Sequence, residues 1–229
     1  MRRRERPLES HPARDLGDAQ RRHWQRTYTA SPEMYGPGPS APAVCAAGRF
    51  RASGATTVLE LGAGHGRDTL YFAEQGFTVI AGDFSSVALR QLRGAAGRRS
   101  LERRILATVH DVREPLPLAA ASVDAAYGHM LLSMALTTDE IQRAVGEVGR
   151  VLRPGGTFVY TVRTTGDAHY GTGVRHGDDI WEQAGFAVHF FSRHLVDTLA
   201  AGWTLEDVAP FEEGDLPRRL WRVTQTRPA

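Results

Sequence analysis

A glycine-rich turn between two apolar runs constrains the fold of this chain more than any other feature. The first run ends in Val58-Leu-Glu-Leu61, glycines follow at 62, 64 and 66, and the second run, 77–82, leads to Asp83. This order predicts a strand, a tight turn, a helix and a second parallel strand, because glycine lets a ligand approach the backbone closely. Unpaired N–H groups at the start of the helix suit an anionic ligand group. An acid at the end of the second strand can accept hydrogen bonds from ribose hydroxyls, so we expect a nucleoside derivative.

The spacing of the glycines distinguishes two classes of nucleoside ligand. The dinucleotide fingerprint G-x-G-x-x-G requires glycine at position 67, which is arginine here. Glu60, Gly62, Gly64 and Gly66 instead match E-x-G-x-G-x-G, and in this the chain resembles class I S-adenosylmethionine-dependent methyltransferases. The resemblance continues, in the family's order, through an adenine-binding segment at 109–112, a fourth strand at 123–127, and a helix, turn and fifth strand at 147–160.

Alternation of strand and helix follows the glycine turn. We expect strands at 57–61, 77–83, 104–110, 123–129, 156–163, 204–211 and 220–226, and helices at 20–28, 43–53, 67–75, 85–94, 139–152 and 192–201. Strands separated by helices predict a parallel sheet. In the resembling family a final antiparallel hairpin closes the sheet. The resemblance therefore implies an α/β fold with a doubly wound, mostly parallel seven-stranded sheet and helices on both faces.

The length of 229 residues, 41% of them hydrophobic, suits a single domain with a full core. Residues 1–30 form a basic leader with eight arginines, which we expect to be partly disordered or helical. Nucleic-acid binding is one interpretation of this leader, but interspersed acids and the lack of an aromatic platform make a nucleic-acid partner unlikely. Residues 31–229 are expected to form one methyltransferase domain. Its segment 164–191 has few periodic apolar residues, and we expect a substrate-covering insertion there.

Composition excludes several kinds of chemistry. No lysine occurs in the sequence, which excludes Schiff-base and lysine general-base mechanisms. The single cysteine, Cys45, can form neither an internal disulfide nor a structural zinc site, which fits a reducing cytoplasm. The histidines between 169 and 194 match no metal-binding spacing, so no metal is expected. The absence of a membrane-length apolar run and of a secretory signal predicts a soluble, cytoplasmic protein with no membrane partner.

The resemblance implies S-adenosyl-L-methionine as the cofactor and S-adenosyl-L-homocysteine as its product. The backbone of the glycine turn and the forked donors of Arg67 would hold the carboxylate of the cofactor. Asp83 would hold the ribose, and Asp111 with the N–H of Val112 would hold adenine. The full predicted cofactor site is Glu60, Gly62, Ala63, Gly64, Arg67, Asp83, Phe84, His110, Asp111, Val112, Gly128 and His129.

Methyl transfer is an in-line displacement that depends mainly on positioning and on exclusion of water. A base is required only when the nucleophile must lose a proton. Three histidines are candidates for this role: His129 after the fourth strand, and His169 and His176 in the 164–191 segment. Packing in the wall of the cofactor site is an equally good interpretation of His129. Further candidates for contact with the substrate or for a lid are Tyr28, Tyr35, Arg163 and Tyr170.

The methyl acceptor is expected to be a small molecule. Residues 128–134 lack the [DNS]-P-P-[YF] signature of many enzymes that methylate nucleic-acid amines. The run Gly66-Arg-Asp-Thr-Leu-Tyr-Phe-Ala73 is similar to the tellurite-resistance and thiopurine branch of the family, which implies a thiol or chalcogen acceptor. An oxygen or nitrogen of a metabolite remains equally open. Two alternatives from other classes are an NAD-dependent oxidoreductase and a non-catalytic S-adenosylmethionine-binding protein.

Overall fold

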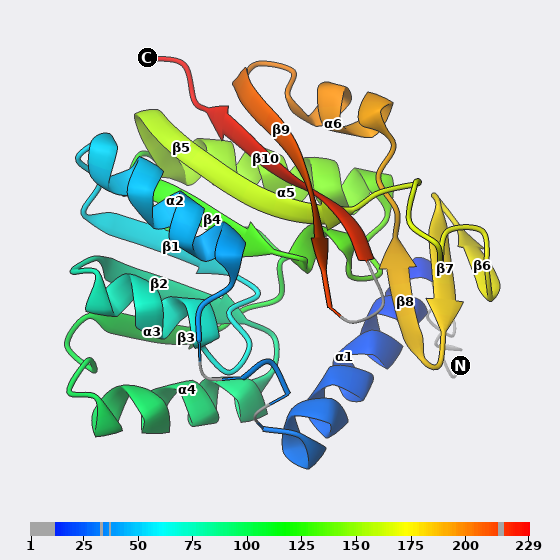
Figure 1. The fold of residues 1–229 in the computed structure, drawn as a ribbon, viewed down its shortest axis with the longest axis horizontal. Helices are drawn as coiled ribbons and strands as arrows, with labels where there is room; N and C mark the ends of the chain where they lie inside the picture. The colour runs from blue at the N-terminus through cyan, green and yellow to red at the C-terminus, as the bar shows by residue number, and fades with distance from the viewer. Residues whose placement is uncertain (1–11, 33, 37, 215–217) are drawn as a thin grey trace, which may run out of the picture.

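A seven-stranded mixed sheet forms the centre of the molecule in the computed structural model, which describes residues 12–32, 34–36, 38–214 and 218–229 (Figure 1). The strands lie in the order β3-β2-β1-β4-β5-β10-β9. Their bounds are β1 Thr57–Leu61, β2 Thr78–Asp83, β3 Ile105–Val109, β4 Val123–His129, β5 Leu152–Arg163, β9 Thr204–Glu213 and β10 Arg218–Thr226. Strands β1 to β5 are parallel, and β10 runs antiparallel between β5 and β9. The predicted sheet with its C-terminal antiparallel hairpin is confirmed.

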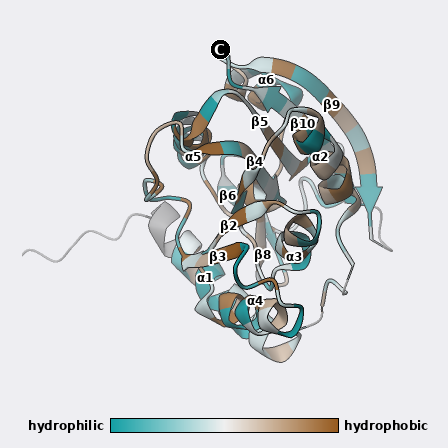
Figure 2. Ribbon diagram, turned by 90° about the vertical axis from the view of Figure 1, so that its left-hand side faces the viewer, coloured by the Kyte–Doolittle hydropathy of each residue, from teal (hydrophilic) through white to brown (hydrophobic). Residues whose placement is uncertain are grey.

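Helices cover both faces of this sheet. Their bounds are α1 Pro12–Ala30, α2 Ala41–Ala52, α3 Arg67–Glu74, α4 Ser86–Arg98, α5 Thr138–Val151 and α6 Arg193–Leu199, with a 3-10 turn η1 at Leu131–Ser133. Figure 2 views the sheet from the side, with α5 on one side of the strands and α2 and α3 on the other. Side chains alternate along a strand, so Val58 joins the apolar cluster of α2, α3 and α4, whereas Leu59 joins that of α5 and α6.

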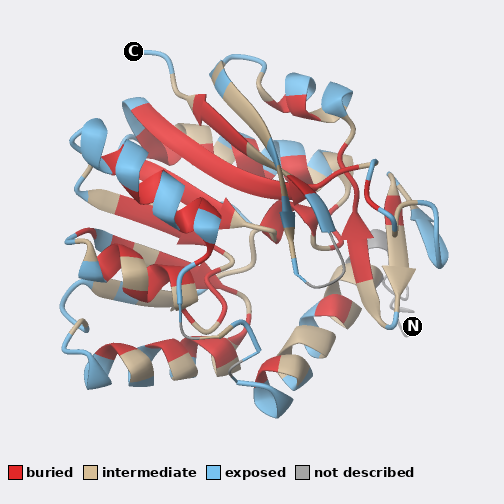
Figure 3. Ribbon diagram, in the orientation of Figure 1, coloured by how far each residue is buried: buried red, intermediate tan, exposed pale blue. Residues whose placement is uncertain are grey.

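Burial follows position in the sheet. The interior strands β1 and β4 and the second half of β5 are largely buried, whereas the edge strand β9 alternates between exposed and half-buried residues (Figure 3). The start of α5 is fixed by a capping box, in which the Thr137 side chain accepts from the backbone of Glu140 and the Glu140 side chain accepts from that of Thr137. Strand β5 begins four residues before the predicted start, directly after α5 ends at Val151.

The segment 164–191 is more ordered than its composition suggested. It contains a three-stranded antiparallel sheet made of β6 Val174–Gly177, β7 Ile180–Gln183 and β8 Phe186–His189. Two tight turns connect the strands, Asp178-Asp179 and Ala184-Gly185, and all four turn residues have positive φ. Such turns match the twist of a hairpin. These strands were not predicted, because strands of four residues are too short to produce a recognisable period.

Helix α1 extends well beyond the predicted helix 20–28 and contacts both the β6–β8 sheet and helix α4. Gln20 donates from Nε2 to the Gly185 carbonyl beside β8 at 2.8 Å, and Gln91 of α4 donates to the Tyr28 carbonyl at 2.8 Å. The part of the leader before residue 12, for which partial disorder was expected, lies outside the described residues. No helix in the described part of the chain is long and apolar enough to cross a membrane.

Candidate active site

A cavity of about 640 Å³ lies at the carboxyl ends of β1, β2, β4 and β5 and is also lined by α1 and the β6–β8 sheet. This end of a doubly wound sheet is where ligands bind in such folds. The volume is within the range of roughly 300–1,000 Å³ that is typical of small-molecule sites. The predicted site residues that line the cavity are Tyr28, Tyr35, Glu60, Gly62, Ala63, Gly64, Arg67, Asp83, Phe84, His129, Arg163 and His169.

The glycine turn forms one end of the cavity, and two of its positions require glycine. Gly64 has φ 55°, and a Cβ there would lie 2.5 Å from the Tyr28 hydroxyl. Gly66 has φ 91°, and a Cβ there would lie 2.2 Å from Cδ1 of Leu92. Both the left-handed backbone and the close neighbours therefore exclude larger residues.

Three acidic side chains surround this turn, and all three are buried. Asp83 accepts hydrogen bonds from the backbone N–H groups of Gly64 at 2.8 Å and Ser85 at 2.7 Å, and burial raises the pKa of its carboxyl to about 6. Glu60 accepts from the Thr69 hydroxyl at 2.5 Å. Burial, reinforced by the nearby Asp68, raises the pKa of Glu60 well above its usual range. Acids in a site of low polarity favour a ligand that brings positive charge and hydroxyl donors to this end.

Arg67, the predicted carboxylate ligand, lies at the rim of the same turn. Its guanidinium is 5.4 Å from the centre of the Tyr35 ring, and its Nε is 3.5 Å from a carboxylate oxygen of Asp68. Its Nη2 is 3.9 Å from Oε1 of Glu213. Its Nη1 donates to the Tyr35 carbonyl at 3.3 Å. The ionic contacts are long and this hydrogen bond uses one of the five N–H donors, so donors remain for an anionic group.

His129, at the end of β4, contacts protein groups through both ring nitrogens. Its Nδ1 is 2.8 Å from the Thr161 hydroxyl, which itself accepts from the N–H of Met130 at 2.9 Å. The Thr161 hydroxyl hydrogen is therefore available to Nδ1. Nε2 of His129 faces Oε2 of Glu213 at 3.4 Å, and this contact lowers the pKa of Glu213. Glu213 was not recognised from the sequence, because the end of β9 comes close to the end of β4 only in the folded sheet.

Aromatic and sulfur-containing side chains form the other end of the cavity. Trp24 of α1 packs against Phe186 of β8 with ring centres 5.3 Å apart. Trp181 and Phe190 complete the aromatic wall, and Met130 and Met134 line the same space. The aromatic residues were not recognised from the sequence, because Trp181 and Phe186 belong to the small sheet, which was not predicted.

Six predicted residues do not line the cavity. His176 lies on β6 and is 2.7 Å from Oε2 of Glu182, and Tyr170 donates to Oδ1 of Asp179 at 2.9 Å. His110, Asp111 and Val112 follow β3 beside Asp83, whose carbonyl accepts from the His110 N–H at 3.0 Å. Gly128 lies within β4, facing Leu61 and Phe158. His176 and Tyr170 thus lie outside the cavity lining and contact acidic side chains of the protein.

Asp111 also differs from its predicted state, because its carboxylate is already occupied. Arg113 donates to it from Nε at 3.0 Å and from Nη2 at 2.7 Å, and the same Nη2 donates to Asp18 of α1 at 3.1 Å. Burial works to raise the pKa of Asp111, but the bonds from Arg113 outweigh it and lower that pKa. An adenine amino group would share this carboxylate with Arg113. Within the described residues no group of three or more histidine, cysteine or acidic side chains could hold a metal ion.

A family model described as a methyltransferase domain matches residues 58–156, which include the glycine turn, Asp83 and the end of β4. This segment is a class I S-adenosylmethionine-dependent methyltransferase domain. Its residues fit the cofactor of that family, since the glycine turn and the buried carboxylates of Glu60 and Asp83 line the same cavity, where the carboxylates can accept hydrogen bonds from hydroxyl and ammonium groups. The resemblance seen in the sequence is confirmed.

Known proteins similar to this methyltransferase domain act on different acceptors. The malonyl-[acyl-carrier protein] O-methyltransferase of Pectobacterium atrosepticum is 34% identical over 110 residues, which are 48% of this chain and 39% of that protein. The chain spans 20% to 53% of the length of the first curated relatives that it matches.

Two solved structures share the fold of this chain. The Burkholderia thailandensis 1,6-didemethyltoxoflavin-N1-methyltransferase, solved with that acceptor and S-adenosylhomocysteine, has a TM-score of 0.74 at 20% identity, covering 99% of this chain and 94% of the other. TehB from Haemophilus influenzae has a TM-score of 0.63 at 13% identity, covering 89% of this chain and 67% of the other.

Proposed function

We propose that the protein transfers a methyl group from S-adenosylmethionine to a small-molecule acceptor. The observation that carries this proposal is the continuity of one cavity from the glycine turn with Glu60 and Asp83 to the aromatic wall around Trp181 and Phe186. One end suits the cofactor, and the other provides an apolar space for a second molecule. A volume of about 640 Å³ suits small ligands better than a polymer.

The acceptor end favours an apolar, flat molecule. Aromatic rings at Trp24, Trp181, Phe186 and Phe190 offer faces and edges for stacking. Met130 and Met134 add polarizable sulfur, which suits a thiol or chalcogen acceptor as well as an aromatic ring with a nucleophilic oxygen or nitrogen. The bound 1,6-didemethyltoxoflavin of the similar N1-methyltransferase supports a small acceptor in this position.

When bound, the cofactor supplies an electrophilic methyl group on a sulfonium centre. The chain's own residues orient the two molecules, because α1, the β6–β8 sheet and the main sheet all line the cavity. For an acceptor that must lose a proton, we assign the proton-accepting role to the Glu213 carboxylate, which lines the cavity and faces Nε2 of His129 at 3.4 Å. The hydrogen bond from His129 lowers the pKa of Glu213, so this carboxylate is ionised at neutral pH.

Calorimetric titration with S-adenosylmethionine, S-adenosylhomocysteine and NAD tests the cofactor. We expect binding of the two adenosyl ligands, because Arg67 occupies the position where a dinucleotide site requires glycine. Binding of NAD that S-adenosylhomocysteine does not displace would instead support an oxidoreductase.

Transfer of labelled methyl groups to thiols, selenols, phenols and aromatic nitrogen heterocycles then tests catalysis. We expect at least one of these classes to be methylated. Binding of the adenosyl ligands without transfer to any class would favour a non-catalytic cofactor-binding protein. Glutamine in place of Glu213 tests the proton-accepting role, because a base is needed for a phenol but not for a thiolate at alkaline pH.

A further inference from the structure

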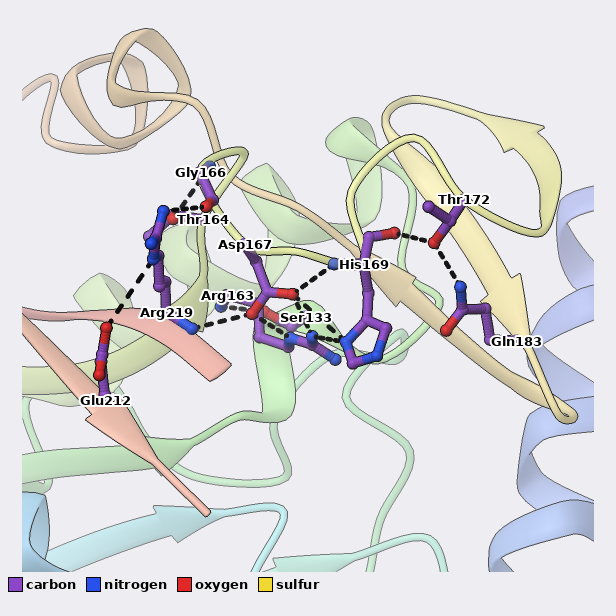
Figure 4. A network of polar contacts seen from close by, with 10 residues as sticks. All are labelled: Ser133, Arg163, Thr164, Gly166, Asp167, His169, Thr172, Gln183, Glu212 and Arg219. Carbon is purple, nitrogen blue, oxygen red and sulfur yellow. Dashed lines mark hydrogen bonds and ion pairs between the residues drawn. The ribbon is translucent and has the colours of Figure 1, made fainter. Parts of the chain in front are cut away.

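A polar network lies behind the acceptor end of the cavity, around the start of the 164–191 segment (Figure 4). It joins Arg163 at the end of β5 with Asp167 and His169 in the following loop. Arg163 and His169 line the cavity, whereas the Asp167 side chain is fully buried. Among the described residues, no hydrogen bond or ion pair joins this network to the glycine turn or to Asp83.

Asp167 is the fixed point of the network. Its carboxylate accepts hydrogen bonds from Nε and Nη2 of Arg163, from the N–H of His169 at 2.8 Å and from the N–H of Arg219 at 2.8 Å. Burial works to raise the pKa of Asp167, but these bonds outweigh it and hold that pKa below its usual value. The carboxylate is therefore ionised, and four donors occupy its lone pairs.

Arg163 connects Asp167 to the ring of His169. Its guanidinium is held by Asp167 and lies 5.0 Å from the centre of the Phe190 ring. From this position Nη2 is 2.7 Å from Nδ1 of His169. A guanidinium has hydrogens on every nitrogen and accepts no hydrogen bond, so Nδ1 of His169 must be the acceptor. An oxygen of Asp167 is also 3.4 Å from Nδ1, but this longer contact competes with the donors that already fill the carboxylate.

The tautomer of His169 follows from this contact. A neutral imidazole with an accepting Nδ1 carries its hydrogen on Nε2. The His169 side chain is 38% exposed and lines the cavity, and its Nε2 has no protein partner among the described residues. The Nε2–H group of His169 is therefore available as a hydrogen-bond donor to a ligand in the cavity. A general base needs the opposite arrangement, with a lone pair directed at the substrate.

We infer that His169 binds the methyl acceptor as a hydrogen-bond donor through Nε2–H, with Arg163 and Asp167 as positioning residues. The acceptor must then carry a lone pair on oxygen or nitrogen, such as a carbonyl or a ring nitrogen, in addition to its methylated atom. The identity of the ligand in this inference rests on the proposed function, whereas the tautomer of His169 rests only on the contact with Arg163. It replaces the sequence-based expectation that His169 acts as a base.

Nitrogen NMR of the full chain labelled at its nine histidines measures the tautomer directly. Long-range proton–nitrogen spectra at pH 7.5, with S-adenosylhomocysteine present, distinguish the two neutral forms and the imidazolium. The signals that disappear in His169→Gln identify the residue. We expect a bare Nδ1 and a protonated Nε2. A protonated Nδ1, in either the neutral or the charged form, would overturn the inference.

Removing the donor tests the role of Arg163. In Arg163→Met, the His169 signals should move to a mixture of both tautomers, because nothing then forces Nδ1 to accept. Arg175→Met is the matched control, since Arg175 is exposed on β6 and has no hydrogen bond to the network. An unchanged tautomer in folded Arg163→Met would show that Arg163 does not set it. If Arg163→Met fails to fold, the spectrum of the unaltered protein still shows which tautomer His169 adopts, and so still tests the inference.

Kinetics of two His169 variants separate a donor from a base. Glutamine places an amide nitrogen near the position of Nε2, whereas asparagine places one near Nδ1. With an acceptor from the methylation screen, His169→Gln should retain kcat/KM within a few fold, and His169→Asn should lose about tenfold or more, mainly through KM, as expected for one hydrogen bond. Equal loss of kcat in both variants would overturn the donor role. A chain that methylates nothing would contradict the proposed function and leave the NMR result standing.

Discussion

At the scale of single residues, burial decides how the acids around the glycine turn behave. Asp83 accepts two backbone hydrogen bonds, yet the loss of water raises the pKa of its carboxyl to about 6. Asp68 is tied into the protein instead, because it accepts from the backbone N–H of Ser40 at 2.7 Å and from its hydroxyl at 2.8 Å. Two acids of the same turn therefore differ in role: Asp83 remains available to a ligand, and Asp68 anchors the start of α2.

Replacing Asp83 with alanine should weaken binding of S-adenosylhomocysteine by about 1–3 kcal/mol, the usual effect of removing hydrogen bonds to a charged group. The exposed Asp139→Ala on α5 is the control and should bind normally. Calorimetry measures both affinities. Undiminished affinity in Asp83→Ala would mean that the ribose does not bind at the end of β2.

The affinity for S-adenosylhomocysteine should also depend on pH through Asp83. Only the ionised carboxylate can accept from both ribose hydroxyls, and a pKa raised to about 6 means that protonation begins as the pH falls toward 6. Binding should therefore be constant at alkaline pH and weaken as the pH falls through 6. Asp83→Asn should remove this dependence. A pH-independent affinity of the unaltered protein between pH 5 and 8 would contradict the role of Asp83.

The steric limit at Gly64 gives a stability prediction. In Gly64→Ala the new Cβ would lie 2.5 Å from the Tyr28 hydroxyl, and φ is 55°. Crowding should cost about 1–3 kcal/mol of unfolding free energy in addition to about 1–2 kcal/mol for the left-handed backbone. Gly54→Ala should lose only the contribution from the left-handed backbone, because its φ is 73° and no atom lies within 4 Å of a Cβ there.

Urea unfolding of the ligand-free protein measures both variants. Adding Tyr28→Phe to Gly64→Ala should restore part of the stability, because it removes the hydroxyl that the new Cβ meets. Equal losses in Gly64→Ala and Gly54→Ala would show that Tyr28 moves away freely and does not limit the turn.

At the scale of elements, the short 3-10 turn η1 and helix α5 connect the cavity to the core. Met130 precedes η1 with φ 61° and lines the cavity, and α5 begins at the capping box of Thr137 and Glu140. Val145 and Val148 of α5 then pack in the main apolar cluster. The position of the cavity wall near β4 therefore depends on where α5 begins.

Thr137→Ala should lower the free energy of unfolding by about 0.5–2 kcal/mol, because it removes the side-chain cap of α5. Thr138→Ala, one residue into the helix, is the matched control and should change stability little. Chemical denaturation of the two variants gives the comparison. A loss in Thr138→Ala as large as in Thr137→Ala would mean that the cap is not what fixes the helix start.

At the scale of the whole molecule, one cavity joins segments that are far apart in the sequence. They include α1, the glycine turn, the β6–β8 sheet and the end of β9. Binding of S-adenosylhomocysteine should therefore slow amide hydrogen exchange at 24–28, 61–66 and 83–85 together, while α6, which does not line the cavity, stays unchanged. NAD should leave the exchange of all these segments unchanged. Protection of 61–66 without any effect on α1 would contradict the closure of the cavity by that helix.

The sequence by itself determined the main sheet and the cofactor end of the cavity. Glycines at 62, 64 and 66, the acid at 83 and the alternation of strand and helix act over short stretches of chain, where backbone freedom and side-chain period leave few choices. Most predicted elements of the main sheet, such as β1 and β4, therefore match the structure within a few residues.

Only the tertiary structure decided the acceptor end. Trp24, Trp181 and Phe186 come together because a small sheet packs against α1, and its four-residue strands carry too weak a period to be recognised. Glu213 meets His129 only after β10 inserts between β5 and β9. The tautomer of His169 depends on one contact from Arg163, which cannot be predicted from the spacing of residues in the sequence. Local conformation thus depends on neighbouring residues, whereas side-chain contacts across the fold form only when distant segments pack together.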